Sequence, residues 1–312
     1  MLCSTGIVFQ ARECIMQQSP ALTLGTATLG MEYGLSNPSR RPSINACFDL
    51  LDNAWQKGIR TLDTAPTYGD SELIIGQWMA SRGHLPAIYS KISTVQNDKE
   101  NISDVILSSI RGSTQRLGVD SIEGIFMHNA ADYLRDDVRE ILCIAKANGQ
   151  ISSVGLSVYD PDEVFRALDK QAPDIIQLPA SVLDRRMLNT GALAACNEAQ
   201  VKVFARSVFL QGALLMRPDD LPDHLAALRR PLEQLRHSAL TARISMVELL
   251  LRSIQGVKGM NSVLVGAFDS QQLNELLAAS NGEPLDEALL GSFAHVGKCI
   301  PPSCLDPRTW PK

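Results

Sequence analysis

The stretch Gly58-Ile-Arg-Thr-Leu-Asp63-Thr-Ala-Pro-Thr-Tyr68-Gly-Asp-Ser-Glu-Leu-Ile-Ile-Gly76 reads as a strand, a polar turn and a helix start. Its strand candidate is Arg60–Thr64, with the acidic Asp63 at its C-terminal end. The helix candidate 71–83 opens with polar and acidic residues, which suit the exposed amides and positive dipole of a helix N-terminus. The stretch therefore predicts a β/α unit with Asp63 and Tyr68 at the C-terminal end of its strand.

This alternation recurs from residue 21 to 280. The strand candidates are rich in Val, Ile and Leu without clean alternation, which is typical of strands buried on both faces. They are Leu22–Thr26, Arg60–Thr64, Ile88–Ile92, Ile122–His128, Ser153–Val158, Ile175–Leu178, Val201–Ala205 and Val263–Gly266. Amphipathic helix candidates follow at 71–83, 103–117, 136–148, 161–168, 241–254 and 270–279. Eight β/α units are the number in a closed (β/α)8 TIM barrel.

An open, doubly wound sheet is the competing α/β architecture. Such a sheet binding a dinucleotide would need G-x-G-x-x-G after its first strand, and the chain contains no G-x-G. The turn Gly25-Thr-Ala-Thr-Leu-Gly30 has the wrong spacing, and no phosphate-binding G-x-x-x-x-G-K-[ST] loop is present. We therefore predict an α/β fold of the (β/α)8 TIM-barrel type.

We expect one domain over residues 1–312, with the barrel core at about 20–280. An insertion at 213–237, charged and helical in pattern, follows the seventh strand and should lie over the C-terminal face of the barrel, where active sites of this fold occur. The proline-rich tail 281–312 either closes over the same face or extends away from it. The sequence leaves both arrangements open.

Composition excludes several classes of protein. The net charge of −5 gives no electrostatic basis for binding nucleic acid or an anionic membrane. No stretch of 18 apolar residues occurs, and Arg12 and Glu13 interrupt the place of a signal peptide, so we expect a cytoplasmic protein. Seven cysteines without a C-x-x-C pair argue against disulfides and zinc, and no H-x-x-x-H pair occurs. We predict no metal.

Four polar residues lie at or just beyond the C-terminal ends of the second, third and fourth strands: Asp63, Tyr68, Lys91 and His128. Each alone has an ordinary structural explanation, such as a turn former, a loop anchor or a rim side chain. Because neighbouring parallel strands end at one rim of a barrel, we expect the four side chains to converge. Together they indicate a catalytic site.

The chemistry that suits this set is the reduction of a carbonyl group. Its oxygen gains negative charge as hydride arrives, so it needs a proton donor. A neighbouring ammonium, Lys91, would make the Tyr68 phenol a better acid, Asp63 would keep Lys91 charged, and His128 would bind the carbonyl oxygen. No side chain supplies hydride, so a nicotinamide cofactor is required.

Over about residues 20–280 the chain resembles the aldo-keto reductases. The resemblance rests on Leu24–Gly30, Gly58–Gly76, Val154–Val158, Ile176–Pro179, Ala205–Gly212 and Leu264–Leu273, which follow in the family's order. It implies a (β/α)8 barrel, NAD(P)(H) bound across the C-terminal rim, and reduction of an aldehyde or ketone to the alcohol. The family's catalytic Asp, Tyr, Lys and His correspond to Asp63, Tyr68, Lys91 and His128, with Tyr68 as general acid.

The same resemblance implies the cofactor site. Its residues are Gly25, Thr26 and Asp63, then Ser157 and Gln177 at the carboxamide, Arg206 beside the nicotinamide, Ser207, Phe209 and Gln211 at the pyrophosphate, and Gly266, Phe268, Gln272 and Glu275 at the adenosine. Arg206 replaces a Tyr that stacks on nicotinamide in many members. Val158 and Leu276 replace frequent Asn residues, and the adenosine segment lacks the cation often used against a 2′-phosphate. The resemblance still favours NADP(H) slightly over NAD(H).

The substrate is the least constrained feature. The loops expected to form its pocket carry Met31, Tyr33, Tyr133 and Met216 together with several polar groups, including Arg40, Arg41, Asn129 and Arg135. This mixture suits a small polar carbonyl such as a sugar, unless the arginines only solvate the rim. No nucleic acid or membrane partner is expected.

Two other functions fit the same residues. The chain could be a cofactor-binding regulatory subunit with little turnover, like the potassium-channel β subunits that share the fold. It could also be an isomerase or lyase that uses Tyr68 and Lys91 without nicotinamide. The physiological substrate, the direction of the reaction and the oligomeric state are not encoded in recognisable motifs.

Overall fold

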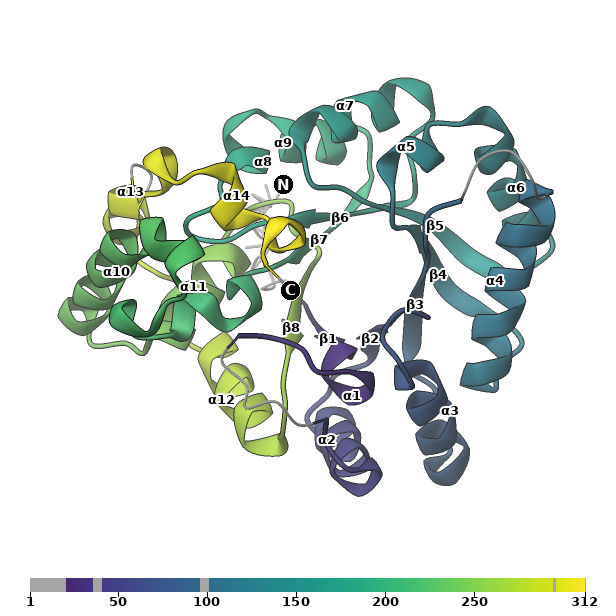
Figure 1. The fold of residues 1–312 in the computed structure, drawn as a ribbon, viewed down its shortest axis with the longest axis horizontal. Helices are drawn as coiled ribbons and strands as arrows, with labels where there is room; N and C mark the ends of the chain where they lie inside the picture. Colours follow the sequence, from purple (N-terminus) through teal and green to yellow (C-terminus); the bar gives the residue numbers. More distant parts are fainter. Residues whose placement is uncertain (1–20, 36–40, 96–100, 294–295, 312) are drawn as a thin grey trace, which may run out of the picture.

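The computed structural model describes residues 21–35, 41–95, 101–293 and 296–311. Eight parallel strands form a closed barrel in sequence order (Figure 1). They are β1 (Ala21–Gly25), β2 (Thr61–Asp63), β3 (Ala87–Ile92), β4 (Ile122–Met127), β5 (Ile151–Ser157), β6 (Ile175–Pro179), β7 (Lys202–Arg206) and β8 (Ser262–Gly266). β8 closes the barrel by pairing with β1 along its whole length. The predicted (β/α)8 fold is confirmed, and every strand lies within two residues of its predicted bounds.

Helices surround the barrel and cover its outer face (Figure 1). The outer helices are α2 (Ile44–Gln56), α3 (Ser71–Arg82), α4 (Ile102–Leu117), α6 (Asp136–Ala147), α7 (Pro161–Lys170), α9 (Ala192–Glu198), α11 (Met246–Gln255) and α12 (Ser270–Ser280). Three short helices lie in the loops at the strand ends: α1 (Ala27–Gly30), α5 (Ala130–Tyr133) and α8 (Arg186–Asn189). The start of α7 shows why the bounds fall where they do, since Asp160 caps it in a capping box with Glu163.

The predicted helix 241–254 is wrong at its N-terminal end. The structure has two helices there, α10 (Arg229–Ala242) and α11. Arg243 adopts a left-handed backbone with φ of 56°, and Ser245 then caps α11. Ser245 accepts a hydrogen bond from the Glu248 backbone N–H at 3.1 Å and donates its own N–H to the Glu248 carboxylate at 2.8 Å. This capping box starts a new helix where simple periodicity continues the old one.

The insertion after β7 is helical, as predicted, but consists of short pieces. It contains the 3₁₀ turns η1 (Leu210–Leu215), η2 (Pro218–Asp220) and η3 (Asp223–Leu228), followed by α10. Its buried leucines form a second apolar cluster, separate from the barrel core, together with residues of the tail.

The tail returns to the C-terminal face of the barrel, which settles the arrangement that the sequence left open. It contains α13 (Glu287–Phe293), η4 (Val296–Cys299), α14 (Pro302–Leu305) and η5 (Pro307–Thr309). Trp310 is buried, donates its indole N–H to the Ser303 carbonyl at 3.1 Å, and packs against His224 of the insertion at 5.8 Å between ring centroids. Figure 1 shows the yellow tail segment that follows α14 beside β7, and its residues Pro307 and Arg308 line the cavity at this face.

An aromatic layer closes the inside of the barrel below its C-terminal rim. Tyr89, Phe126, Ile175 and Phe204 form this cluster, with the Tyr89 and Phe204 rings 5.2 Å apart. Gly155 of β5 leaves room for it, because a Cβ there would lie 2.4 Å from the Phe126 ring. The barrel is therefore a filled core, and its C-terminal rim is the floor of any cavity above it.

An ion pair between a buried carboxylate and a partly exposed guanidinium fixes the outside of β3. Glu72 of α3 is 1% exposed and contacts Arg116 of α4 at 2.7 Å, and Ser90 of β3 donates its hydroxyl to the same carboxylate. These contacts connect two helices to the strand that carries Lys91.

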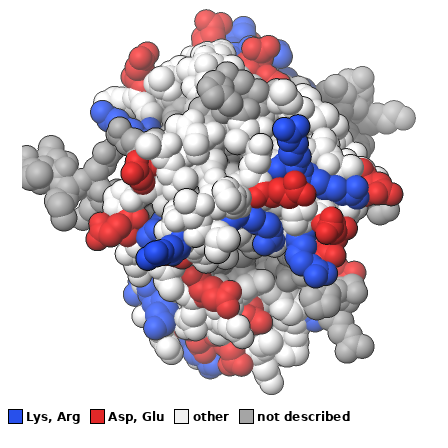
Figure 2. Space-filling view, turned by 90° about the vertical axis from the view of Figure 1, so that its left-hand side faces the viewer, with Lys and Arg blue, Asp and Glu red and all other residues white. Residues whose placement is uncertain are grey.

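Charged side chains of both signs are interspersed over the face shown in Figure 2, without a continuous basic area. Within the described ranges, no helix is both long enough and apolar enough to span a bilayer. Cys47, Cys143, Cys196, Cys299 and Cys304 are free thiols, while Cys3 and Cys14 lie outside the described residues.

Candidate active site

A cavity of about 370 Å³ opens at the C-terminal ends of the strands. Every strand contributes to its wall through a residue near its C-terminal end, within the strand or just beyond it: Gly25, Asp63, Lys91, His128, Ser157, Gln177, Arg206 and Gly266. Its volume lies within the range of about 300–1,000 Å³ found for small-molecule sites. The rim of the barrel is therefore the candidate active site.

Strand geometry explains why these side chains face the cavity. Successive side chains of a strand point to opposite faces, so residues two apart share a face. The polar residues stand two positions after members of the aromatic layer: Lys91 after Tyr89, His128 after Phe126, Gln177 after Ile175 and Arg206 after Phe204. The aromatic layer is the floor, and the polar residues form the next layer above it.

Asp63 and Lys91 form a buried ion pair at the base of the cavity. The Lys91 Nζ lies 2.6 Å from Asp63 Oδ1, and both side chains are about 5% exposed. Lys91 also donates to the Thr64 carbonyl oxygen at 2.9 Å, and Gln177 donates to Asp63 Oδ2 at 2.8 Å. Both carboxylate oxygens are thus hydrogen-bonded, as a buried charge requires.

The Tyr68 ring lies against this pair, with its centroid 4.9 Å from the Lys91 Nζ. Burial raises the pKa of Tyr68 above its usual value, and the charge of Lys91 and the hydrogen bond to it offset only part of that rise. Burial alone would lower the pKa of Lys91, but Asp63 and Tyr68 outweigh it and raise the pKa above its usual value. At neutral pH the site therefore holds a protonated phenol beside a charged ammonium.

The loop that carries Tyr68 is held by close backbone packing against α1. A Cβ on Gly30 would lie 1.8 Å from the Tyr68 carbonyl oxygen, so only glycine fits there. Gly69 in turn has φ of +56° and packs on the Gly30 carbonyl. The Ser71 hydroxyl contacts the Thr26 hydroxyl at 2.8 Å, which joins the loop to the end of β1. The phenol is therefore placed by backbone contacts.

His128 faces the cavity from the end of β4. Partial removal from water lowers its pKa, and the positive charges of Lys91, Arg206 and Arg308 lower it further. The imidazole is therefore neutral at pH 7 and can donate one hydrogen bond to an oxygen in the cavity.

Most residues expected to contact the cofactor line the same cavity. They are Gly25, Thr26, Asp63, Ser157, Gln177, Arg206, Ser207, Phe209, Gln211, Gly266, Gln272 and Glu275. Phe268 is not among the lining residues; its backbone N–H donates to the Gln272 side chain at 2.8 Å. Ser207, Leu210 and Gln211 adopt left-handed backbones with φ of 63°, 48° and 52°, so the turn after β7 is sharply bent beside the cavity.

Several side chains expected in a substrate pocket lie elsewhere. Tyr133 lines a separate, smaller pocket and donates its hydroxyl to the Gln171 carbonyl. Arg41 forms an ion pair with Asp70, and Asn129 caps α5. Met31, Met216 and Arg135 do not line the cavity, whereas Tyr33 does, and Arg40 lies outside the described residues. Tyr133, Arg41 and Asn129 follow the strands expected, but their side chains make contacts away from the main cavity.

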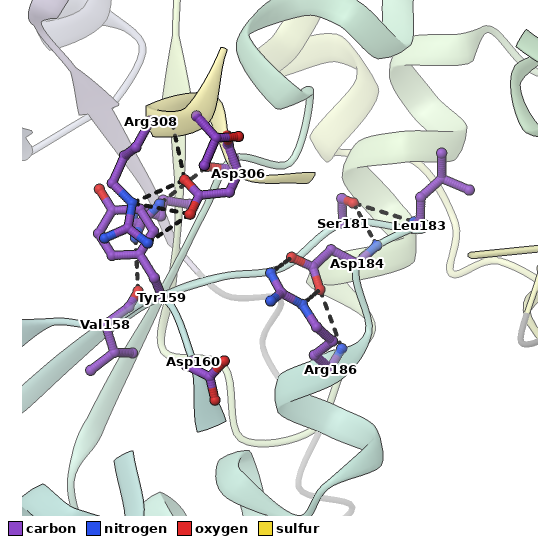
Figure 3. A network of polar contacts seen from close by, with 12 residues as sticks. Val158, Tyr159, Asp160, Ser181, Leu183, Asp184, Arg186, Asp306 and Arg308 are labelled. Atoms are coloured by element: carbon purple, nitrogen blue, oxygen red, sulfur yellow. Dashed lines mark hydrogen bonds and ion pairs between the residues drawn. The ribbon is translucent and has the colours of Figure 1, made fainter. Parts of the chain in front are cut away.

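Sequence reasoning missed Tyr159 and Arg308. Both line the cavity, and the Arg308 guanidinium carbon lies 3.2 Å from the centroid of the Tyr159 ring. Arg206 contacts the same ring at 3.9 Å. Figure 3 shows Arg308 held against Tyr159 while Asp306 binds its guanidinium. The sequence could have identified Tyr159, because Pro161 marks the start of a helix and places Tyr159 in the loop at the rim. The position of Arg308 depends on how the tail folds, which the sequence does not predict.

The wall of the cavity suits an extended cofactor. One end holds Asp63, Tyr68 and Lys91, and the other is formed by β8 and the start of α12, where Gln272 and Glu275 lie. Arg206 has a buried Nε atom without a hydrogen-bond partner, which is an unused donor in the wall. Within the described part of the chain, no group of three or more His, Cys, Asp or Glu side chains has the arrangement of a metal site.

Comparison with known proteins identifies the family. The model of the Aldo/keto reductase family matches residues 21–296. The chain is 26% identical over 273 residues to the NADH-specific methylglyoxal reductase of Escherichia coli, covering 75% of this chain and 82% of the relative. It is 27% identical over 230 residues to the D-threo-aldose 1-dehydrogenase of a Pseudomonas species, covering 62% of this chain and 67% of the relative.

Solved structures agree with the fold. The aldo-keto reductase AKR11C1 from Bacillus halodurans matches with a TM-score of 0.72 at 22% identity, over 89% of this chain and 92% of that chain. The glycerol dehydrogenase AKR11B4 from Gluconobacter oxydans matches with a TM-score of 0.72 at 19% identity, over 90% and 94%. With the closed barrel and the family match over residues 21–296, the chain belongs to the aldo/keto reductase family.

Proposed function

We propose that this protein is an NAD(P)(H)-dependent oxidoreductase that reduces an aldehyde or ketone to the alcohol. Membership of the family supports the oxidoreductase class. The observation that carries the specific reaction is the grouping of Tyr68, Lys91 and Asp63 at one end of the cavity, with His128 beside them.

Each side chain has a role that follows from its contacts. Tyr68 donates the proton to the carbonyl oxygen, and Lys91 stabilises the phenolate that this transfer leaves. Asp63 keeps Lys91 charged at 2.6 Å, and neutral His128 orients the carbonyl by a hydrogen bond to its oxygen. A bound nicotinamide would supply the hydride. Ser157 and Gln177 would hold its carboxamide, and residues 207–211 its pyrophosphate.

The choice between the two cofactors turns on the adenosine end of the cavity. The slight preference for NADP(H) stays a prediction based on the family. Gln272, Glu275 and Leu276 line this end, and among the described lining residues there no cation accompanies the Glu275 carboxylate. The 2′-phosphate of NADP(H) would lie near the Glu275 carboxylate, and this unfavourable contact supports NAD(H) instead. The Escherichia coli relative, an NADH-specific methylglyoxal reductase, supports the same choice.

The substrate that we propose is a small polar carbonyl compound, with a sugar as one example. The cavity wall mixes aromatic and charged groups, namely Tyr33, Tyr159, Arg206 and Arg308. Both the single-domain organisation over residues 1–312 and a cytoplasmic location remain proposals from the sequence.

The test is titration of the purified protein with NADH and NADPH separately, followed by a panel of aldehydes and ketones. The proposal predicts binding of at least one dinucleotide and steady turnover with a carbonyl. Binding without turnover on any carbonyl would support a regulatory subunit, and failure to bind either dinucleotide would support a cofactor-independent isomerase or lyase.

A further inference from the structure

The charges around the cavity are not balanced at its catalytic end. Asp63 is paired with Lys91 at 2.6 Å, and Arg308 is paired with Asp306 at 2.6 Å. Arg206 lines the same cavity, and among the described residues it makes no ion pair. Glu275 lies at the adenosine end. The Asp306 carboxylate also acts on Arg206 electrostatically, but its two oxygens are bound to Arg308. Arg206 is therefore the guanidinium of this wall without an ion-pair partner of its own among the described residues.

The guanidinium of Arg206 also has unused donors. It donates to the Val158 carbonyl oxygen at 2.8 Å and more weakly to the Ser207 hydroxyl at 3.4 Å. Its Nε is buried without a partner. A guanidinium carries five N–H donors arranged to match a carboxylate or phosphate. An anion beside Arg206 would use these donors and neutralise its charge.

The tail adds a second cation to this wall. The Tyr159 ring contacts both guanidiniums, at 3.9 Å for Arg206 and 3.2 Å for Arg308 (Figure 3). Both oxygens of Asp306 contact Arg308, and buried Trp310 anchors the same segment. Arg308 is therefore a fixed part of the wall.

These cations act on the reacting groups. Arg206 and Arg308 both lower the pKa of His128, and Arg206 also lowers that of Tyr68. Both guanidiniums line the same cavity as Tyr68 and His128, which is the geometric basis of this effect. The end of the cavity that would receive a substrate thus carries a positive potential.

We propose that the preferred substrates are small carbonyl compounds that carry an anionic group, a carboxylate or a phosphate, which binds Arg206 with Arg308 as the second cation. This inference rests on the proposed carbonyl reduction and specifies its substrate class. Binding of the anion to Arg206 would place the carbonyl group of the same substrate at Tyr68, and it would favour substrates in which the two groups have the matching separation.

The experiment compares matched charged and neutral substrates. The probes are 4-oxobutanoate against its methyl ester, and glyceraldehyde 3-phosphate against glyceraldehyde. We expect kcat/KM to be at least about tenfold higher for the charged member of at least one pair, which is the effect of one charge-assisted contact. The pair with the larger ratio distinguishes a carboxylate from a phosphate.

Variants then assign the preference to the arginine. Arg206→Gln should reduce the charged-to-neutral ratio by about 10- to 100-fold, and Arg206→Lys should retain part of it. Arg308→Gln should reduce the ratio less, because Asp306 already offsets its charge. The matched control is Arg217→Gln, which removes one exposed guanidinium of the insertion and should leave the ratio unchanged.

Failures of the two proposals are distinguishable. Absence of turnover on every carbonyl would contradict the proposed function. Turnover of the neutral compounds, with equal kcat/KM for the charged ones, would overturn the inference alone. It would also be overturned if Arg206→Gln weakened NADH binding in a fluorescence titration while the charged-to-neutral ratio stayed unchanged, because the arginine would then serve the cofactor.

Discussion

Replacing Lys91 by Met separates the structural and chemical roles of the buried ion pair. The substitution keeps the aliphatic length but removes the ammonium, leaving the Asp63 carboxylate, about 4% exposed, with the Gln177 amide as its remaining side-chain partner. Removing one partner of a buried pair typically costs about 3–5 kcal/mol, because the other charge stays desolvated. We expect Lys91→Met to lower the free energy of unfolding by that amount at pH 7.

The double variant Lys91→Met/Asp63→Asn removes both charges. It should recover most of the lost stability, since neutral replacement of a buried pair is often tolerated. Its turnover should nevertheless stay about 10²- to 10⁴-fold below wild type, because no ammonium stabilises the Tyr68 phenolate. Loss of turnover without loss of stability would thus assign the ammonium to the chemistry.

The assays are urea denaturation followed by circular dichroism, and reduction of one carbonyl at saturating cofactor. Lys57→Met is the matched control, because Lys57 is exposed at the end of α2, and we expect both quantities to stay at wild-type values. Turnover of Lys91→Met within about threefold of wild type at pH 7 would refute the reasoning, as would a double variant less stable than the single one.

Three further predictions concern the backbone packing at Gly30, the ion pair between Glu72 and Arg116, and the dependence of stability on pH. Gly30→Ala should lower kcat by about 10²-fold and stability by about 1–3 kcal/mol, because its Cβ displaces the loop that carries Tyr68. Gly291→Ala, in α13 with open space around it, should leave kcat unchanged and raise stability by at most about 1 kcal/mol through helix propensity. Arg116→Met should cost about 1–3 kcal/mol in thermal or urea unfolding by unpairing a carboxylate that is 1% exposed, and exposed Arg111→Met on the same helix should cost nothing measurable. The pKa of His128 is lowered on folding, so the unfolded chain binds the proton more readily, and the wild-type protein loses stability as the pH falls below about 6.5. His128→Asn should therefore lose less stability than wild type between pH 7 and pH 5. Equal losses in the two proteins would contradict a lowered pKa of His128.

Local patterns predict the barrel well because they reflect burial. Strands covered on both faces must be apolar throughout, so their ends are marked where polar residues such as Asp63 and His128 appear. Parallel strands of a barrel end at one rim, so these residues could be placed together without knowledge of their contacts. The spacing of two between Phe204 and Arg206 carries the same information for β7.

The missed features depend on contacts between distant segments. Arg308 lies in a tail segment whose Trp310 packs on the insertion, and no periodicity within the tail encodes that contact. The outward turn of the loop that carries Tyr133 is likewise decided by its packing on α7 and β5. The break before α11 was readable, since Ser245 and Glu248 have the spacing of a capping box.

Tyr68→Phe tests the central assignment most directly, with cofactor affinity and the rate of a single turnover measured on the same preparation. The phenol oxygen acts on the substrate oxygen and the ring stays in place, so NADH or NADPH should bind within about twofold of wild type while the rate falls at least about 10²-fold. A rate near wild type would show that another group protonates the carbonyl, and a loss of cofactor binding equal to the loss of rate would show that Tyr68 serves the cofactor instead.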